Sequence, residues 1–136
     1  MLDLRNLNKA LDALSLAFEI YDQKLLPEYE PEKIVLRDGV IQRFEFTYEL
    51  AWKTLKRYLQ EYGLEKVDSL NNRDLFRVGF EQGLIDDPTV WFHYLKMRNQ
   101  SSHVYDEVKA AQVFAAAREF QQAAQSLLER IAAKIQ

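Results

Sequence analysis

Apolar side chains recur at steps of three and four residues along most of this 136-residue chain. This spacing places them on one face of an α-helix, and such a face leaves water by packing against other helices. Four glycines and three prolines offer few points at which a helix would be interrupted. The pattern predicts an all-α protein, and its length is typical of one domain spanning residues 1–136.

Three long helices are predicted, at about residues 3–25, 32–62 and 106–135. Gly63 is expected to end the second helix, and residues 64–70 to form a loop. The residues expected to face the core are Leu4, Leu7, Leu11, Leu14, Phe18, Tyr21, Leu25, Ile41, Phe44, Tyr48, Ala51, Trp52, Leu55, Leu59, Tyr62, Trp91, Val113, Ala117, Phe120, Ala124, Leu127, Leu128 and Ile131.

Two further helices are predicted between the second and the last. Asn71 or Asn72 is expected to cap a short helix that Gly83 closes. Asp87 is expected to cap the next helix, with Pro88 at its first position. The chain is thus predicted to form an antiparallel up-and-down four-helix bundle with one additional short helix.

The second helix contains the main ambiguity of the sequence. Asp38-Gly39 lies between short apolar runs, which is a strong β-hairpin signal. An isolated hairpin is marginal in water, however, and no other segment offers a third strand. Glycine inside a helix costs only about 1 kcal/mol relative to alanine, so a continuous helix is favoured.

The same helix carries more apolar surface than one stripe requires. Leu36, Val40, Phe46 and Leu50 lie off its main face. A helix that is apolar on two sides is either central to a bundle or half of an interface. A homodimer is predicted, because no helix of a small bundle is expected to be wholly central.

Composition excludes several classes of protein. The chain has no cysteine, which rules out disulfides and cysteine nucleophiles and permits a reducing compartment. It has no apolar run near the roughly 18 residues of a membrane span and no recognisable secretory leader, so a cytoplasmic location without membrane contact is predicted. A net charge of −3 argues against nonspecific coating of nucleic acid but allows a small site for one phosphodiester.

Residues 98–107 concentrate an arginine, a histidine, hydroxyls, an amide and a tyrosine. On an unbroken helix, Arg98 and His103 would lie about 140° apart. They converge only if the helix breaks near Ser101-Ser102 or if two subunits bring their copies together. One interpretation is a simple helix end with capping serines and a solvated histidine.

The other interpretation is a catalytic site. Histidine transfers protons near neutral pH, and arginine offers a cationic fork for a phosphate. Together they can cleave RNA through its own 2′-hydroxyl, a reaction that needs no metal. No metal or cofactor is predicted, because the chain has only two histidines, His93 and His103, and they lie ten residues apart.

A small basic cluster lies on the second helix, formed by Lys53, Lys56 and Arg57. Such a cluster is commonly a solvated face. It is also a candidate contact for RNA or a protein partner, and Ser102 is a further candidate of this kind.

Two stretches resemble one known family. Residues 98–105, Arg-Asn-Gln-Ser-Ser-His-Val-Tyr, resemble the Arg–x4–His–x–Tyr signature of HEPN domains. Residues 42–53 resemble the second helix of a HEPN branch, the nucleotidyltransferase substrate-binding proteins. Members of this branch are regarded as toxins paired with minimal nucleotidyltransferase antitoxins, and the resemblance covers about residues 30–135.

This resemblance implies a homodimer with a composite site and metal-independent endoribonuclease activity on an RNA such as tRNA or mRNA. It implies that His103 transfers protons, Arg98 stabilises the phosphate and Asn99 orients the pair. Tyr105 would be the hydroxyl that the partner nucleotidyltransferase adenylylates to silence the toxin. The alternative is a non-catalytic subunit that presents substrate to a separate nucleotidyltransferase.

Overall fold

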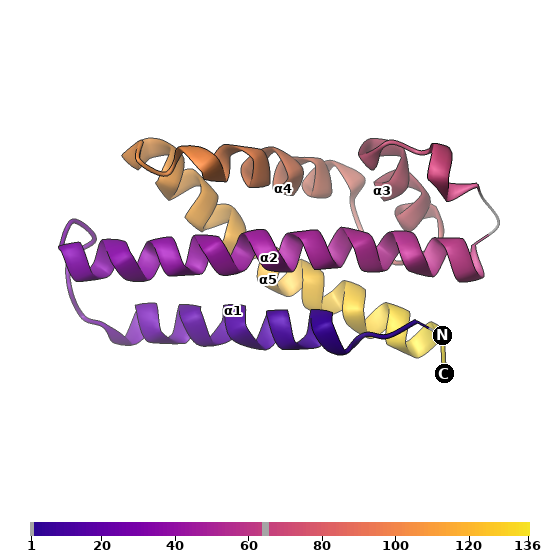
Figure 1. The fold of residues 1–136 in the computed structure, drawn as a ribbon, viewed down its shortest axis with the longest axis horizontal. Coiled ribbons are helices and arrows are strands. Elements are labelled where there is room, and N and C mark those ends of the chain that lie inside the picture. The colour runs from indigo at the N-terminus through magenta and orange to yellow at the C-terminus, as the bar shows by residue number, and fades with distance from the viewer. Residues whose placement is uncertain (1, 64–65) are drawn as a thin grey trace.

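The computed structural model describes residues 2–63 and 66–136, which are helical apart from short connections. The elements are α1 (Arg5–Gln23), α2 (Pro31–Tyr62), η1 (Val67–Ser69), α3 (Asn72–Glu81), α4 (Pro88–Gln100), η2 (Ser101–His103) and α5 (Glu107–Lys134). Helices α1, α2, α4 and α5 alternate in direction, and α3 is the additional short helix (Figure 1). The predicted all-α bundle is confirmed for these residues.

The predicted starts of α3, α4 and α5 each have a side-chain cap. The side chain of Asn71 accepts a hydrogen bond from the Asp74 amide at 2.9 Å, and Asp87 accepts one from the Thr89 amide at 2.9 Å. Asp106 accepts from two amides at the start of α5. These bonds satisfy amides that the first helical turn leaves without partners.

The end of α1 differs from the prediction. The helix stops at Gln23, and Leu25 lies beyond it with 92% of its surface exposed. The buried Lys33 of α2 donates hydrogen bonds to the carbonyl oxygens of Tyr21 and Lys24. Its ammonium group thereby caps the negative end of α1. Sequence periodicity could not reveal this contact, because it joins two helices.

The second helix ends as predicted. The Gly63 amide donates to the Leu59 carbonyl at 2.9 Å. Of the predicted loop at 64–70, residues 64–65 lie outside the described part, and the remainder contains the 3₁₀ turn η1. Tyr62 is exposed rather than in the core.

The core is centred on Phe120 of α5. Its ring centroid lies between 5.2 and 6.0 Å from the rings of Phe44, Tyr48, Trp91 and Tyr94. Two of these rings come from α2 and two from α4, so one side chain joins three helices. The predicted role of Trp91 as a core residue is confirmed. Trp52 is instead only partly buried, at the edge of the core.

The surplus apolar residues of α2 have a different explanation from the predicted one. Val40 is fully buried, and Leu36 and Leu50 pack against the core, whereas Phe46 is 52% exposed. Helix α2 lies between α1 on one side and α4 on the other, with α5 crossing behind it (Figure 1). It is therefore central, so this apolar surface alone does not require a second subunit.

Among the described residues, no helix is both long enough and apolar enough to cross a membrane.

Helix α2 runs unbroken through Asp38-Gly39, so the helical interpretation is confirmed over the hairpin. A Cβ added at Gly39 would meet no atom within 4 Å. We expect Gly39→Ala to raise the free energy of unfolding by about 0.5–1 kcal/mol in urea denaturation, because alanine is the better helix former.

Gly83→Ala is the matched control for this substitution. Gly83 has a φ of 76°, a conformation that alanine adopts at a cost of about 1 kcal/mol. It should therefore lower the free energy of unfolding. Destabilisation by Gly39→Ala would contradict the continuous helix.

Candidate functional site

The polar motif lies at the end of the bundle where α4 gives way to α5. Helix α4 ends at Gln100, and η2 continues it for one tighter turn. The Asp106 amide then donates to the His103 carbonyl at 3.0 Å, which closes a turn around Val104 and Tyr105. The helix therefore breaks near Ser101-Ser102, which is one of the two conditions named for Arg98 and His103 to converge. This break places the histidine and the tyrosine in a short exposed connection.

Arg98 points from the last turn of α4 toward α2. Its Nη1 donates to Glu45 Oε2 at 3.1 Å, and its Nε lies 3.3 Å from Glu49 Oε1. The side chain is 30% exposed. Two carboxylates therefore lie against the guanidinium, and one of them, Glu45, accepts a hydrogen bond from it. Within the described residues, the buried Nε makes no hydrogen bond, so its contact with Glu49 is one of charge alone.

Two neighbouring side chains fix these carboxylates. The buried Ser101 places its Oγ 2.9 Å from Glu45 Oε2 and 2.6 Å from the Arg98 carbonyl oxygen. Trp52 Nε1 donates to Glu49 Oε2 at 3.1 Å. Each carboxylate thus has contacts besides Arg98, which restricts its rotamer freedom.

The hydroxyl of Tyr48 is buried near this ion pair and has no partner among the described residues. Burial raises the pKa of this hydroxyl above its ordinary value, and the charge of Glu49 adds to the effect while Arg98 opposes it. Tyr48 therefore stays neutral at physiological pH.

His103 and Tyr105 form a second, exposed pair. His103 Nδ1 lies 3.3 Å from the Tyr105 hydroxyl oxygen, and the two rings meet edge to face. Tyr105 is 80% exposed. Its hydroxyl is thus open to another molecule while remaining within hydrogen-bond distance of the imidazole.

The connection that carries this pair is tied to the bundle on both sides. Arg37 of α2 donates to Glu107 at 2.6 Å. Burial lowers the pKa of Arg37, but hydrogen bonds to Glu107 and Asp38 outweigh it and raise the pKa overall. Gln100 also donates to the Lys109 carbonyl at 3.2 Å. The turn is therefore exposed but anchored.

The other predicted site residues do not join the Arg98 cluster. Asn99 is exposed on another side of α4, and the exposed Ser102 places its hydroxyl 3.3 Å from the Asn99 carbonyl oxygen. No hydrogen bond described here joins Arg98 to His103. In one chain, the two principal residues therefore have separate partners.

The predicted basic cluster lies farther along α2. Lys53 and Arg57 are exposed, and Lys56 is partly buried. Helical spacing places Lys56 on the same face as Glu45 and Glu49, about two to three turns away. It therefore shares a helix face with the two carboxylates without forming part of the ion-pair network.

Sequence reasoning missed Glu45, Glu49 and Ser101. The carboxylates are four residues apart within a stretch of recognised family resemblance, so they share a helix face. That spacing was a usable signal. The sequence did not show that this face meets Arg98, because the contact spans 53 residues.

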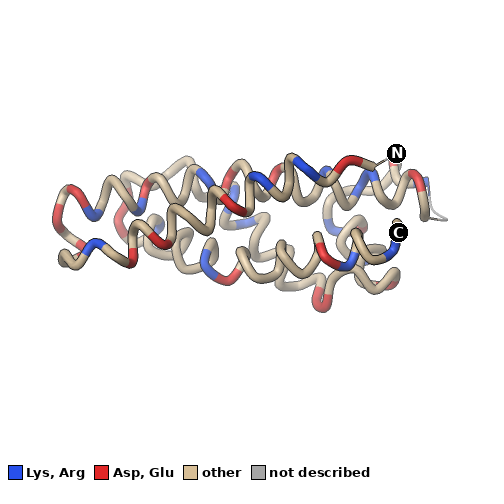
Figure 2. Tube along the Cα trace, turned by 90° about the horizontal axis from the view of Figure 1, so that it is seen from below, with Lys and Arg blue, Asp and Glu red and all other residues tan. Residues whose placement is uncertain are grey.

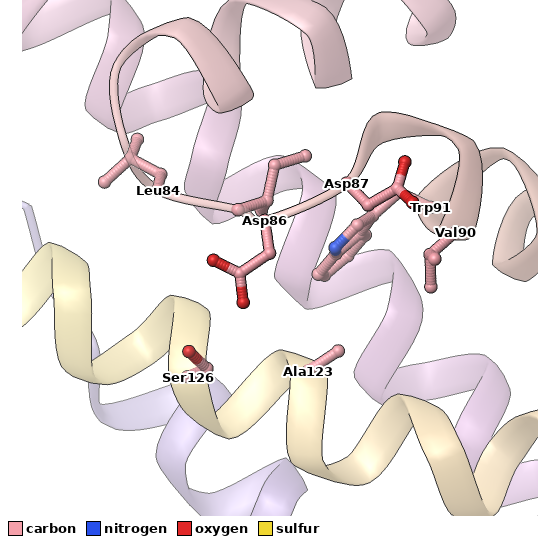
Figure 3. Close-up of a pocket in the computed structure, with 8 residues that line it drawn as sticks. Leu84, Asp86, Asp87, Val90, Trp91, Ala123 and Ser126 are labelled. Atoms are coloured by element: carbon pink, nitrogen blue, oxygen red, sulfur yellow. The ribbon is translucent and has the colours of Figure 1, made fainter.

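A separate small cavity of about 220 Å³ lies at the connection between α3 and α4 (Figure 3). Asp86 and Trp91 line it from that connection and α4, and Ser126 lines it from α5. None of the predicted site residues borders it. Acidic and basic residues are interspersed along the helices nearest the viewer in Figure 2, so that side has no stripe of one sign.

Comparison with known proteins identifies relatives over nearly the whole chain. Residues 2–133 match the model of the family described as nucleotidyltransferase substrate binding protein like. The probable ribonuclease HepT of Haemophilus influenzae is 39% identical over 95 residues, which are 68% of this chain and 65% of that protein. The matched region is thus slightly less than two thirds of that relative's length.

Two solved structures share the fold. One, from Haemophilus influenzae, is described as a substrate-binding domain of a nucleotidyltransferase, and it matches with a TM-score of 0.86 and 33% identity over 96% of this chain and 99% of that chain. A crystal structure from Thermus thermophilus matches with a TM-score of 0.70 and 30% identity over 90% of this chain and 98% of that chain.

The fold and the site define a helical-bundle protein with an Arg–x4–His motif where helix α4 ends. The chain belongs to the family of nucleotidyltransferase substrate-binding proteins. The family resemblance predicted from the two sequence stretches is therefore confirmed.

The ion pair between α2 and α4 leads to a stability prediction. We expect Glu45→Ala to lower the free energy of unfolding by about 1–2 kcal/mol, because it removes an acceptor from a partly buried guanidinium. Urea denaturation measures the change. The exposed Gln42→Ala, one turn earlier on α2, is the control and should cost less than about 0.5 kcal/mol. Equal effects would show that Arg98 does not depend on Glu45.

Proposed function

We propose that this protein is a metal-independent endoribonuclease toxin of the HEPN type, acting in the cytoplasm as a single domain. The observation that carries the proposal is the Arg98–His103 motif: a guanidinium positioned by two carboxylates, followed by an exposed imidazole at a helix end. The similarity to a protein named probable ribonuclease HepT supports the same activity.

The working site is composed of two chains. Within one chain, Arg98 faces the carboxylates of α2, while His103 faces Tyr105 in the exposed turn. A two-fold homodimer brings identical surfaces together, so the Arg98 of one protomer can meet the His103 of its partner. The dimer therefore supplies the convergence that a single chain does not make.

The RNA supplies its own nucleophile in this reaction. Nε2 of His103 accepts the proton of a ribose 2′-hydroxyl, whose oxygen attacks the adjacent phosphorus. The bond to the 5′ oxygen breaks, and the imidazolium returns a proton to that oxygen. The products are a 2′,3′-cyclic phosphate and a 5′-hydroxyl. Arg98 stabilises the extra negative charge on the phosphorus in the transition state.

The Tyr105 hydroxyl can accommodate the tautomer that this step needs. For Nε2 to accept a proton, Nδ1 must carry one, and the Tyr105 oxygen 3.3 Å away is its acceptor. The same oxygen is the proposed target of a minimal nucleotidyltransferase antitoxin. The phenol oxygen attacks the α-phosphorus of ATP, pyrophosphate leaves, and an AMP group remains beside the imidazole. This group blocks the site and offers Arg98 a competing phosphate.

The motif leads to an activity prediction. We expect His103→Ala and Arg98→Ala each to lower the rate of RNA cleavage about 10²- to 10⁴-fold, as loss of a proton-transfer group or charge stabiliser does. Purified protein is incubated with total tRNA or with mRNA, with and without a chelator, and the cyclic phosphate product is measured.

Arg43→Ala, at an exposed position of α2, is the control and should cleave like the wild type. Far-UV circular dichroism verifies that every variant is folded. Cleavage that persists in His103→Ala would show that the nuclease assignment to this site is wrong, and cleavage lost with chelator would contradict metal independence.

A second candidate function is a non-catalytic subunit that presents substrate to a separate nucleotidyltransferase. The family description and the related solved structure favour it, since both refer to substrate binding. This alternative requires that the wild type cleave no RNA but stimulate nucleotide transfer by the partner enzyme.

Regulation is tested at Tyr105. We expect co-expression with the cognate nucleotidyltransferase to add one or more AMP units to the wild type, because the hydroxyl is exposed at the tip of an anchored turn. Intact mass measures the gain, and peptide mapping locates it. Tyr105→Phe should gain no AMP, whereas Tyr29→Phe, which alters another exposed tyrosine, should be modified normally. An adduct at a different residue would contradict this regulation.

A further inference from the structure

A groove of about 450 Å³ lies between α3 and α4, beside the proposed site. The residues that line it are Arg73, Phe92, His93, Leu95, Lys96 and Asn99. Arg73 lies over the Phe92 ring, with its Cζ 4.8 Å from the ring centroid, and Arg77 approaches the same ring at 5.7 Å. The groove thus combines cations with an aromatic surface.

The charge of this region differs from that of the whole protein. The chain carries a net charge of −3, yet residues 88–105 contain no aspartate or glutamate. Within the described part of the chain, neither Arg73 nor Lys96 has an ion-pair partner. Arg77 pairs with Asp74 at 3.2 Å, at the border of the groove. The groove is therefore a local positive region on an acidic protein.

The exposed face of α4 leads from this groove to the proposed site. His93, Lys96 and Asn99 are exposed at intervals of three residues, and His103 follows four residues later. Intervals of three residues keep His93, Lys96 and Asn99 on neighbouring positions of one face of α4, and His103 follows in η2. Lys96 lies about 6 Å before the end of α4 along the helix axis, given its rise per residue, and His103 ends the 3₁₀ turn that follows. A strand held in the groove would thus continue toward the imidazole.

We propose that this groove binds single-stranded RNA next to the phosphodiester that is cleaved. Lys96 and Arg73 contact backbone phosphates, and a base stacks against the Arg73–Phe92 pair. Aromatic rings and guanidinium planes are general platforms for bases, while lysine and arginine supply salt-sensitive phosphate contacts. The inference rests on the proposed function, since it assigns the substrate strand to that same site.

The composition of the groove favours RNA over a protein partner. Leu95 is the only aliphatic residue among the described residues that line the groove, whereas the core of a protein interface is typically apolar and poor in charge. The predicted contacts on α2, by contrast, have no such platform: the best approach there is Lys53 at 5.9 Å from the Trp52 ring.

The test measures binding separately from cleavage. All variants carry His103→Ala, so that a short fluorescein-labelled single-stranded RNA of mixed sequence stays intact, and anisotropy gives Kd over a range of KCl concentrations. We expect Lys96→Ala and Arg73→Ala each to raise Kd about three- to tenfold. Each should also reduce by about 0.7 the slope of log Kd plotted against the logarithm of the KCl concentration, because one phosphate contact is lost. Phe92→Leu should raise Kd about fivefold or more at an unchanged slope.

Lys9→Ala is the matched control, because it removes an exposed lysine of α1 and should change neither quantity. If the His103→Ala parent binds RNA and all three groove variants have the same affinity and salt slope as that parent, the proposal that the groove binds RNA is overturned. The proposed nuclease function is not affected by that result. The RNA-binding groove is also overturned if the groove variants keep their RNA affinity but no longer co-purify with the nucleotidyltransferase. That result would assign the groove to a protein contact.

The outcomes separate the groove from the proposed function. Weaker binding in the groove variants, combined with no cleavage by the wild type, would support the groove and overturn the nuclease. If neither the wild type nor the His103→Ala parent binds RNA, both proposals fail.

Discussion

The ion pair between Arg98 and the carboxylates of Glu45 and Glu49 is the contact on which the geometry of the site depends. It joins the end of α4 to the middle of α2, two helices that otherwise contact each other sparsely. A partly buried guanidinium without such partners would be costly, so the pair fixes the direction in which α4 ends. The direction of η2, and with it the position of His103, follows from that constraint.

Local sequence signals predicted most of the fold. Capping residues such as Asn71 and Asp106 act on amides a few residues away, so the sequence itself contains both partners. Contacts between distant helices could not be predicted in this way. Val40 was assigned to a surplus face because periodicity does not reveal that α2 has neighbours on several sides. The motif residues were recognised from their spacing, whereas the role of Glu45 required the packing of α4 on α2.

The functional elements gather around one helix and the turn that follows it. Helix α4 contributes Arg98 on its side toward α2 and the basic groove on its exposed side, and the turn presents His103 and Tyr105. The proposed silencing by a single modification rests on this arrangement. An AMP group on Tyr105 would stand beside the proton-transfer group, within reach of the arginine and close to the path proposed for the RNA strand.

The central claim is that Arg98 of one protomer works with His103 of its partner, and mixing two inactive chains tests it most directly. Arg98→Ala and His103→Ala chains are co-refolded so that heterodimers form, and RNA cleavage is compared with each parent alone. Half of the dimers should be heterodimers, each with one complete site, so about one quarter of wild-type activity should return. Heterodimers that form, as verified by native mass spectrometry, yet cleave no RNA would contradict the shared site.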